Sequence, residues 1–458
     1  MNRLVVVSNR VTVPGYNTPP GGLVVGVLSA LRQAGGIWFG WSGRTTETPG
    51  DPEVLEKEGI RFVTIDIATS LFESYYSGFC NSTLWPLHHY FIGTFRYDAA
   101  EFEAYLAVNR AFAAALAPMV QPDDLIWVHD YHLMPLGGML RQLGLTNRLG
   151  FFLHIPYPHI ALLRALPVYA ELVRDLCQYD LVGLQTDEDI EGFRSAVKMV
   201  FDEAQIGEDH IALPARRVET GAFPIGVDVD SIAQQAASAA REDERVTRMV
   251  SSLLGRKLLL GVDRLDYSKG LVERFAAYRT LLESSPDLVG RVSYVQIAPL
   301  SRINVAAYAE IRDTLERAAG HTNGQYADTD WTPVRYLNRD FPHETLSGLL
   351  RVANVGVVTP LRDGMNLIAK EFVAAQDPED PGALVLSSMA GAARELPDAL
   401  LVNPYDRGGV ALALRQALAM PLAERRARHE AMMGSLRRYS IKRWYGEFTA
   451  RLQATASP

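Results

Sequence analysis

The chain contains very little cysteine. Its 458 residues include only Cys80 and Cys177, which lie far apart and form no Cys-x-x-Cys pair. A disulfide framework or a zinc site is therefore not expected, and two packed thiols in a reducing cytoplasm are. The opening apolar run is too short for a signal peptide, and no later run reaches membrane-spanning length. We expect a soluble, cytoplasmic protein without a membrane partner.

An excess of basic residues is also lacking. Lys and Arg total 45 and Asp and Glu total 53, which gives a formal net charge of −8. This balance argues against nucleic acid or an anionic membrane as the partner. It is compatible with local Arg and Lys clusters that bind a phosphorylated small molecule.

Short runs rich in Val, Ile and Leu alternate with helical patterns along most of the chain. Continuous apolar strands separated by helices are typical of parallel sheets covered on both faces. The strands are too many for one sheet, so we expect an α/β fold with two doubly wound, Rossmann-like domains facing across a cleft. The domains are predicted at 1–230 and 231–440, with a C-terminal helix at 441–458 packed on the first. The expected strands are 4–8, 37–41, 61–66, 124–129, 148–154 and 180–185, then 257–262, 291–298, 334–338, 354–359, 383–387 and 399–403.

The G-x-G-x-x-G pattern of dinucleotide sites is absent. A glycine pair, Gly21 and Gly22, stands instead before an expected helix over 23–34. Glycine at a helix start lets an anion approach the backbone N–H groups closely. The pair can equally ease a turn and nothing more, and this fragment alone does not decide between the two.

The most informative segment is 363–371, Asp-Gly-Met-Asn-Leu-Ile-Ala-Lys-Glu, which follows an apolar strand and opens a helix. A strand, a tight turn and a helix N-terminus together form an anion site. Asp363 can accept hydrogen bonds from sugar hydroxyls, and Glu371 from a diol such as ribose. The segment predicts a pocket for a nucleotide diphosphate that carries a sugar.

Two cations, Arg264 and Lys269, lie in the loop after the strand 257–262. Both can converge on a diphosphate. The alternative is a solvated loop whose basic residues pair with Asp263 and Asp266. The neighbouring 363–371 segment favours the phosphate site. No metal-ligand set accompanies these residues, so we expect the cations and the helix N-terminus to neutralise a leaving diphosphate without a metal or other cofactor.

Polar residues also end two strands of the first domain. Asp130 follows the strand 124–129 and His154 ends the strand 148–154. A lone histidine is more often structural, but a cluster at strand ends favours a sugar or polyol site.

Aromatic residues of the first half and one arginine from each half suit a phosphorylated acceptor. Tyr76 and Trp85 offer aromatic faces, although a Trp can equally fill the core. Arg10 ends the opening strand, and Arg302 follows a strand of the second half. These two arginines are expected to clamp an acceptor phosphate across the cleft.

Together these motifs resemble the trehalose-6-phosphate synthases, retaining glycosyltransferases of the GT-B type. The resemblance covers nearly the whole chain, through VVVSNR, GGL, WFGWSG, LWP, HDYHL, FFLHIP, DRLDYSKG and TPLRDGMNL in one order. It implies transfer of glucose from a nucleotide diphosphate-glucose, with UDP-glucose expected, to glucose 6-phosphate, which gives α,α-trehalose 6-phosphate. It also implies a metal-independent homodimer or homotetramer.

The same resemblance assigns roles to individual residues. The implied acceptor site consists of Arg10, Tyr76, Trp85, Asp130 and Arg302. The implied donor site consists of Gly22, His154, Arg264, Lys269, Asp363, Gly364, Met365, Asn366, Leu367 and Glu371. The implied catalytic residues are Arg264, Lys269, Asp130 and His154.

Two segments, 90–96 and 157–161, depart from the family pattern, which usually has an acidic residue before the helix that follows the second. These departures leave room for a sister synthase that uses a different phosphorylated acceptor, such as glycerol 3-phosphate or an aminocyclitol phosphate. A non-catalytic sugar-phosphate-binding subunit is a further alternative. Such a subunit should have lost Arg264, Lys269 or Glu371, and this chain has all three.

Overall fold

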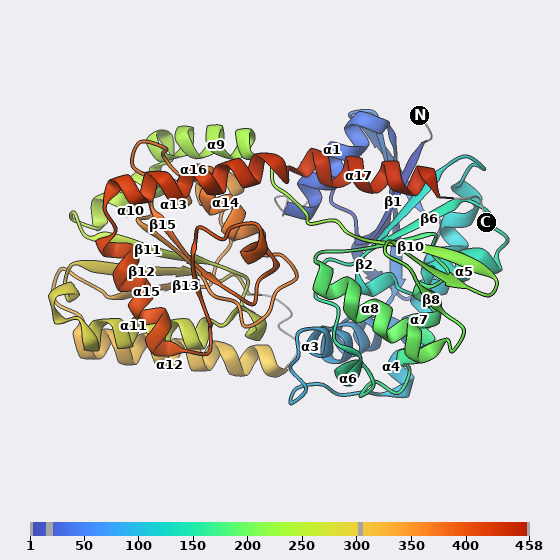
Figure 1. Ribbon diagram of the computed structural model, residues 1–458, viewed down its shortest axis with the longest axis horizontal. Coiled ribbons are helices and arrows are strands. Elements are labelled where there is room, and N and C mark those ends of the chain that lie inside the picture. The colour runs from blue at the N-terminus through green and yellow to red at the C-terminus, as the bar shows by residue number, and fades with distance from the viewer. Residues whose placement is uncertain (1–2, 15–21, 301–305, 456–458) are drawn as a thin grey trace. The chain divides into compact units, whose positions relative to one another are not determined.

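The computed structural model describes residues 3–14, 22–300 and 306–455 (Figure 1). Contacts divide the chain into two compact units, one comprising Met1–Ile225 with Lys442–Pro458 and the other Gly226–Ile441. The sequence predicts this division after residue 230. Within the described ranges, no helix is both long enough and apolar enough to cross a membrane.

The first unit is built on a sheet with the strand order β3-β4-β2-β1-β5-β6-β7-β10-β9-β8. The seven central strands of this order, β4-β2-β1-β5-β6-β7-β10, run parallel. At the two edges, β3 pairs antiparallel with β4, and β9 pairs antiparallel with β10 and β8. The strands are β1 (Leu4–Arg10), β2 (Gly36–Thr46), β3 (Glu53–Lys57), β4 (Ile60–Ala68), β5 (Leu125–His129), β6 (Arg148–Phe152), β7 (Leu181–Leu184), β8 (Gln205–Ile206), β9 (His210–Leu213) and β10 (Arg216–Ala222). The helices are α1 (Gly22–Ala34), α4 (Ala99–Leu116), α5 (Leu136–Gln142), α6 (Ile160–Leu163), α7 (Tyr169–Leu176) and α8 (Asp187–Val200), with short turns η2 (Ala117–Met119) and η3 (Tyr131–Leu133).

A π-helix, η1 (Glu73–Leu84), lies between the single turns α2 (Thr69–Phe72) and α3 (Trp85–His88). A side chain within it follows the same five-residue spacing as the wide turns: Asn81 Nδ2 donates to the carbonyl of Tyr76, five residues earlier, at 2.7 Å. A Cβ at Gly78 would lie 2.5 Å from the Glu101 carboxyl carbon, so a larger residue there would displace the Glu101 side chain of α4. π-Helical turns are rare and often occur at functional sites. Tyr76 lies within this one and Trp85 follows it.

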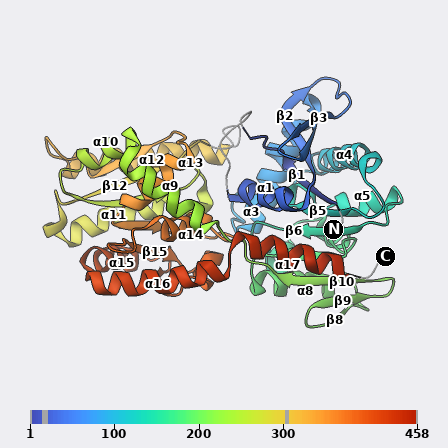
Figure 2. The same ribbon diagram turned by 90° about the horizontal axis from the view of Figure 1, so that it is seen from above.

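The helix α17 (Ile441–Ala454) packs on the sheet of the first unit (Figure 2). The ring of Phe448 stacks on Trp127 of β5, with centroids 4.6 Å apart and planes 15° apart. Ideal Cβ atoms at Gly150 and Gly183 would come within 2.7 and 2.6 Å of the Phe448 ring. Glycine in two adjacent strands, β6 and β7, therefore makes the space that α17 fills.

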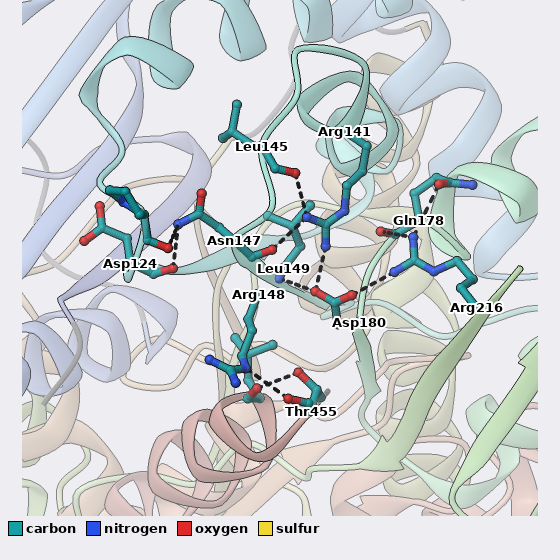
Figure 3. Close-up of polar contacts among 12 residues, drawn as sticks. Asp124, Arg141, Leu145, Asn147, Arg148, Leu149, Gln178, Asp180, Arg216 and Thr455 are labelled. Carbon is teal, nitrogen blue, oxygen red and sulfur yellow. Dashed lines mark hydrogen bonds and ion pairs between the residues drawn. The ribbon is translucent and has the colours of Figure 1, made fainter. Parts of the chain in front are cut away.

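A buried polar network joins the amino ends of several strands in the first unit (Figure 3). Asp180, just before β7, accepts from Arg141 at 2.7 Å and from Arg216 at 2.8 Å. It also accepts from the backbone N–H of Leu149 at 2.7 Å. Two guanidinium groups and one amide thus compensate the buried carboxylate. This network is structural, and it leaves the carboxyl ends of the strands for the predicted site residues.

The second unit has a fully parallel sheet with the order β13-β12-β11-β14-β15-β16. The helices α9, α13 and α14 pack together, as do α11, α12 and α15, so helices cover both faces (Figure 1). The two sheets confirm the predicted doubly wound, Rossmann-like class. The strands are β11 (Lys257–Val262), β12 (Val292–Ile297), β13 (Val334–Leu337), β14 (Val355–Val358), β15 (Ala383–Ser387) and β16 (Leu400–Val402). The helices are α9 (Val229–Glu242), α10 (Glu244–Ser252), α11 (Leu271–Ser284), α12 (Ala306–Tyr326), α13 (His343–Val352), α14 (Leu367–Ala375), α15 (Arg407–Ala419) and α16 (Leu422–Arg438), with short turns η4 (Tyr267–Lys269), η5 (Pro286–Leu288) and η6 (Gly391–Arg394).

Candidate active site

The loop after β11 carries the two predicted phosphate-binding cations. Arg264 is exposed, whereas Lys269 ends η4 and is only 9% exposed. The next residue, Gly270, has φ +65°, and a Cβ there would lie 2.4 Å from the Thr359 carbonyl oxygen. Only glycine allows this close approach to the strand end of β14. The loop is therefore pinned against the segment that leads to Asp363.

Lys269 and Asp363 form an ion pair in this arrangement. The Lys269 Nζ lies 2.5 Å from the Asp363 Oδ2, and Asn366 Nδ2 donates to the same oxygen at 3.1 Å. Asp363 thus orients an ammonium and an amide from two different loops. The alternative in which Lys269 pairs with Asp263 or Asp266 is wrong, because Asp363 holds the ammonium group.

The Asp263 carboxylate forms an ion pair with Arg274 of α11, whose side chain is 1% exposed. The Arg274 Nη1 donates to Asp263 at 2.7 Å, and its Nε donates to Thr359 Oγ1 at 3.0 Å. Its Nη2 donates to the Lys269 carbonyl at 3.1 Å. Burial raises the pKa of Asp263, which the nearby guanidinium opposes. One buried arginine therefore holds the loop of Lys269 to the ends of β11 and β14.

The turn 363–366 is fixed by its backbone. Asn366 adopts φ +73° and its side chain accepts from Ala369 N at 3.2 Å, which caps α14. The carbonyl of Met365, a residue only 3% exposed, accepts from Ala392 N at 2.9 Å. A Cβ at Gly391 would lie 2.0 Å from the Gly364 carbonyl oxygen. The turn therefore brings the N-terminus of α14, where Leu367 is the first residue, next to Asp363 and Lys269.

Glu371 lies one turn into α14 and is 8% exposed. Its Oε1 is 3.8 Å from the Nε2 of His343, the first residue of α13. The interaction with the nearby Glu371 carboxylate raises the pKa of His343, and burial opposes this shift. Sequence reasoning missed His343, because a lone histidine at the start of a helix carries no motif.

In the first unit, Asp130 and His154 are in contact at the ends of β5 and β6. Asp130 has φ +76°, and its Oδ1 accepts from the backbone N–H of His154 at 3.1 Å. The Nε2 of His154 lies 3.1 Å from Nδ1 of the buried His129. Burial lowers the pKa of His154 to about 3 and that of His129 well below its usual value. Both imidazoles are therefore neutral at physiological pH.

The predicted aromatic residues differ in exposure. Tyr76 is half-buried and stacks on Phe72 and His132, with centroid distances of 5.4 and 6.0 Å. Trp85 is 4% exposed, and its ring lies 4.1 Å from that of His89. Most of the Trp85 surface therefore fills the core, the other of the two possibilities raised for it.

Arg10, at the end of β1, is exposed, and its guanidinium lies over Trp41 at 5.8 Å from the ring centroid. Gly43 adopts φ +95°, and a Cβ there would come within 2.9 Å of the Arg10 Nη2. A cation–π contact with Trp41 thus orients Arg10, and Gly43 leaves space beside its guanidinium. Gly22 is the first residue of α1. Gly21 and Arg302 lie outside the described residues.

The two segments that depart from the family pattern touch each other. The backbone N–H of His159 donates to the Tyr90 hydroxyl at 3.0 Å. The ring of His159 in turn accepts from Ala161 N at 3.2 Å and caps α6. The two segments are therefore joined by a hydrogen bond. Among the residues that the structure describes, no three or more His, Cys, Asp or Glu side chains are grouped as a metal site would require.

Comparisons with known proteins identify the family of the chain. The model of glycosyltransferase family 20 matches residues 7–454. The trehalose-6-phosphate synthase of Klebsiella pneumoniae is 46% identical over 454 residues, which cover 99% of this chain and 95% of that protein. An α,α-trehalose-phosphate synthase (UDP-forming) from Burkholderia xenovorans, solved with glucose-6-phosphate, is 47% identical with a TM-score of 0.95, covering 99% and 100% of the two chains. An E. coli structure bound with UDP-2-fluoro glucose is 44% identical with a TM-score of 0.96, covering 100% of both chains.

Proposed function

Because the chain belongs to glycosyltransferase family 20, we propose that it transfers glucose from UDP-glucose to glucose 6-phosphate and forms α,α-trehalose 6-phosphate. The relatives solved with glucose-6-phosphate and with UDP-2-fluoro glucose support this pair of substrates. The observation that carries the proposal is the contact of Lys269, Asp363 and Asn366 at the N-terminus of α14. It supplies a fixed cation and a helix dipole to a diphosphate, and Arg264 adds a second cation nearby.

In the proposed mechanism, charge develops on the diphosphate as its bond to glucose breaks. Lys269 and Arg264 stabilise that charge, and the effect of Lys269 is largest in the transition state because its ammonium group is already held in place. The acceptor hydroxyl attacks from the face that the diphosphate leaves, and a departing phosphate oxygen takes its proton. The configuration at the glucose carbon is thereby retained without a protein nucleophile.

The remaining residues bind and orient the substrates. Glu371 accepts from the ribose of the donor, while Gly22 and the turn 363–367 provide backbone contacts. Arg10, held on Trp41, binds the acceptor phosphate together with Arg302. Asp130 and Tyr76 face the acceptor sugar.

Substitution of the two cations tests the mechanism. We expect Lys269→Ala and Arg264→Ala each to lower kcat by about 10²–10³, the effect of removing one preorganised donor from a developing negative charge. Turnover is measured with UDP-glucose and glucose 6-phosphate, with product identification. Arg312→Ala is the control, because Arg312 is an exposed arginine of the same unit that pairs with Glu316 on α12. Wild-type turnover in both cation variants would rule out their role.

We further infer that the enzyme needs no divalent metal, since Lys269, Arg264 and the helix N-terminus supply the positive charge. Turnover is expected to be unchanged in excess EDTA. Complete inhibition that only Mg²⁺ or Mn²⁺ reverses would contradict this. We also propose a cytoplasmic homodimer or homotetramer, which light scattering of the purified chain would identify by mass.

A further inference from the structure

His129 is a buried histidine in direct contact with a proposed donor-site residue. It is the last residue of β5 and is 0% exposed, and its Nδ1 lies 3.1 Å from the Nε2 of half-buried His154. Both rings are neutral, as described above. In such a pair one nitrogen must donate and the other must accept, so the proton position on His129 sets the proton position on His154.

The surroundings of the other His129 nitrogen indicate which tautomer is present. Its Nε2 is buried and has no hydrogen-bond partner among the described residues. The ring is enclosed by Trp127, Phe152 and Trp444, at centroid distances of 4.4, 6.3 and 6.2 Å. A buried N–H without an acceptor is rarer in proteins than an unused acceptor. The favoured tautomer of His129 therefore has an unprotonated Nε2 and carries its proton on Nδ1, which donates to His154.

We propose that His129 is a positioning residue that donates from Nδ1 to Nε2 of His154 and so holds His154 with its own proton on Nδ1. In this tautomer His154 offers an N–H donor to a hydroxyl of the transferred glucosyl group. The role at the sugar rests on the proposed function, whereas the tautomer does not. The backbone bond from His154 N to Asp130 fixes the residue, and His129 fixes its ring.

Three substitutions at position 129 separate donation from packing. The Asn amide nitrogen can occupy the place of the imidazole Nδ1, the Gln amide nitrogen reaches the place of Nε2, and Phe keeps the ring without a donor. We expect His129→Phe and His129→Gln to lower kcat by about 10–100-fold, as removal of a partner behind a functional histidine does elsewhere. His129→Asn should retain kcat within a few-fold. Equal kcat in the Phe and Asn variants would overturn the proposal.

A matched control addresses the loss of any buried histidine. His429 is 5% exposed in the second unit, where its Nε2 is 3.1 Å from the Val373 carbonyl oxygen. We expect His429→Asn to leave kcat unchanged. A fall in kcat for His429→Asn as large as for His129→Phe would count against a specific role of His129.

A spectroscopic measurement tests the tautomer independently of catalysis. In ¹⁵N-histidine-labelled full-length protein, His154 should give the shifts of an Nδ1–H imidazole, assigned by their loss in His154→Asn. The opposite tautomer, with the proton on Nε2 of His154, would overturn the proposal even in an active enzyme. If the Nδ1–H tautomer is found but the chain lacks transferase activity, the proposed function fails and the positioning role of His129 stands.

Discussion

At the scale of single residues, the candidate donor site depends on a buried arginine that is not itself one of the proposed donor-binding residues. Arg274 donates to Asp263, Thr359 and the Lys269 carbonyl, and also to Gln296 Oε1 at 3.0 Å. Its guanidinium thus joins β11, β12 and the end of β14 to the loop that carries Lys269. A motif search cannot assign this role, because Arg274 reads as an ordinary basic residue of a helix.

Replacing Arg274 by Met is expected to lower the free energy of unfolding of the second unit by about 3–5 kcal/mol, because Asp263 then stays buried without its partner. Denaturant titration of the full chain measures the change. Arg279→Met, at a half-buried position on the same helix where the arginine pairs with Glu283, should cost less than about 1 kcal/mol. Addition of Asp263→Asn should recover part of the loss. Equal stabilities of the two Met variants would contradict this account.

The site residues that the sequence predicted share one property. Asp363, Lys269 and Asp130 follow apolar strands, and the carboxyl ends of parallel strands are where ligands of such sheets bind. His343 and Trp41 gave no such signal, and their contacts to Glu371 and Arg10 arise from tertiary packing. Partners of this kind depend on which segments meet in space, which a single sequence does not state.

Among the elements, every expected strand is present, because apolar runs between helices leave few other structures possible. The strands that were missed are β3, β8, β9 and β10. β3 is exposed along most of its length, and β8 has only two residues, so neither shows the burial pattern used for prediction. The π-helix η1 was also missed, since its wide turns depend on side chains such as Asn81 and on the fit of Gly78 against α4.

The packing of α17 on the first unit predicts opposite stability changes for substitution of two glycines. Gly183→Ala should destabilise the first unit by about 1–3 kcal/mol, since its Cβ would overlap Phe448. Gly446→Ala, within α17 itself, should stabilise it by about 0.5–1 kcal/mol, because a Cβ there meets no atom within 4 Å and Ala is the better helix former. Thermal unfolding of both variants measures the difference. Shifts of the same sign would show that α17 is not seated as described.

Over the whole molecule, stability depends on pH through buried groups of opposite type. Burial lowers the pKa of His88 to about 4, and its Nδ1 lies 2.8 Å from the Pro156 carbonyl oxygen. Burial, with a smaller contribution from Glu171, raises the pKa of Asp175 to about 7. As the pH falls, His88 therefore gains a proton in the unfolded chain before it does so in the folded chain. As the pH rises, Asp175 loses its proton in the unfolded chain before it does so in the folded chain.

Two variants should accordingly respond to pH in opposite directions. As the pH falls from 6.5 to 5, the free energy of unfolding of the wild type should fall by about 2 kcal/mol, because His88 stays neutral in the folded chain. The His88→Asn variant can keep the hydrogen bond to Pro156 and should not show this fall. Asp175→Asn should stabilise the chain by up to about 4 kcal/mol above pH 7, and the gain should vanish as the pH falls to 4. Unfolding measured across this range checks both signs. Parallel pH profiles for both variants and the wild type would refute the assignment.

The position of α17 also has a consequence for biosynthesis. The aromatic face around Trp127 and Phe152 belongs to the part of the protein made first, yet Phe448, which covers it, leaves the ribosome only after all of Gly226–Ile441 has been translated. Until then the nascent chain carries an open apolar surface, a state prone to aggregation. Termination of translation before residue 441 would make that exposure permanent.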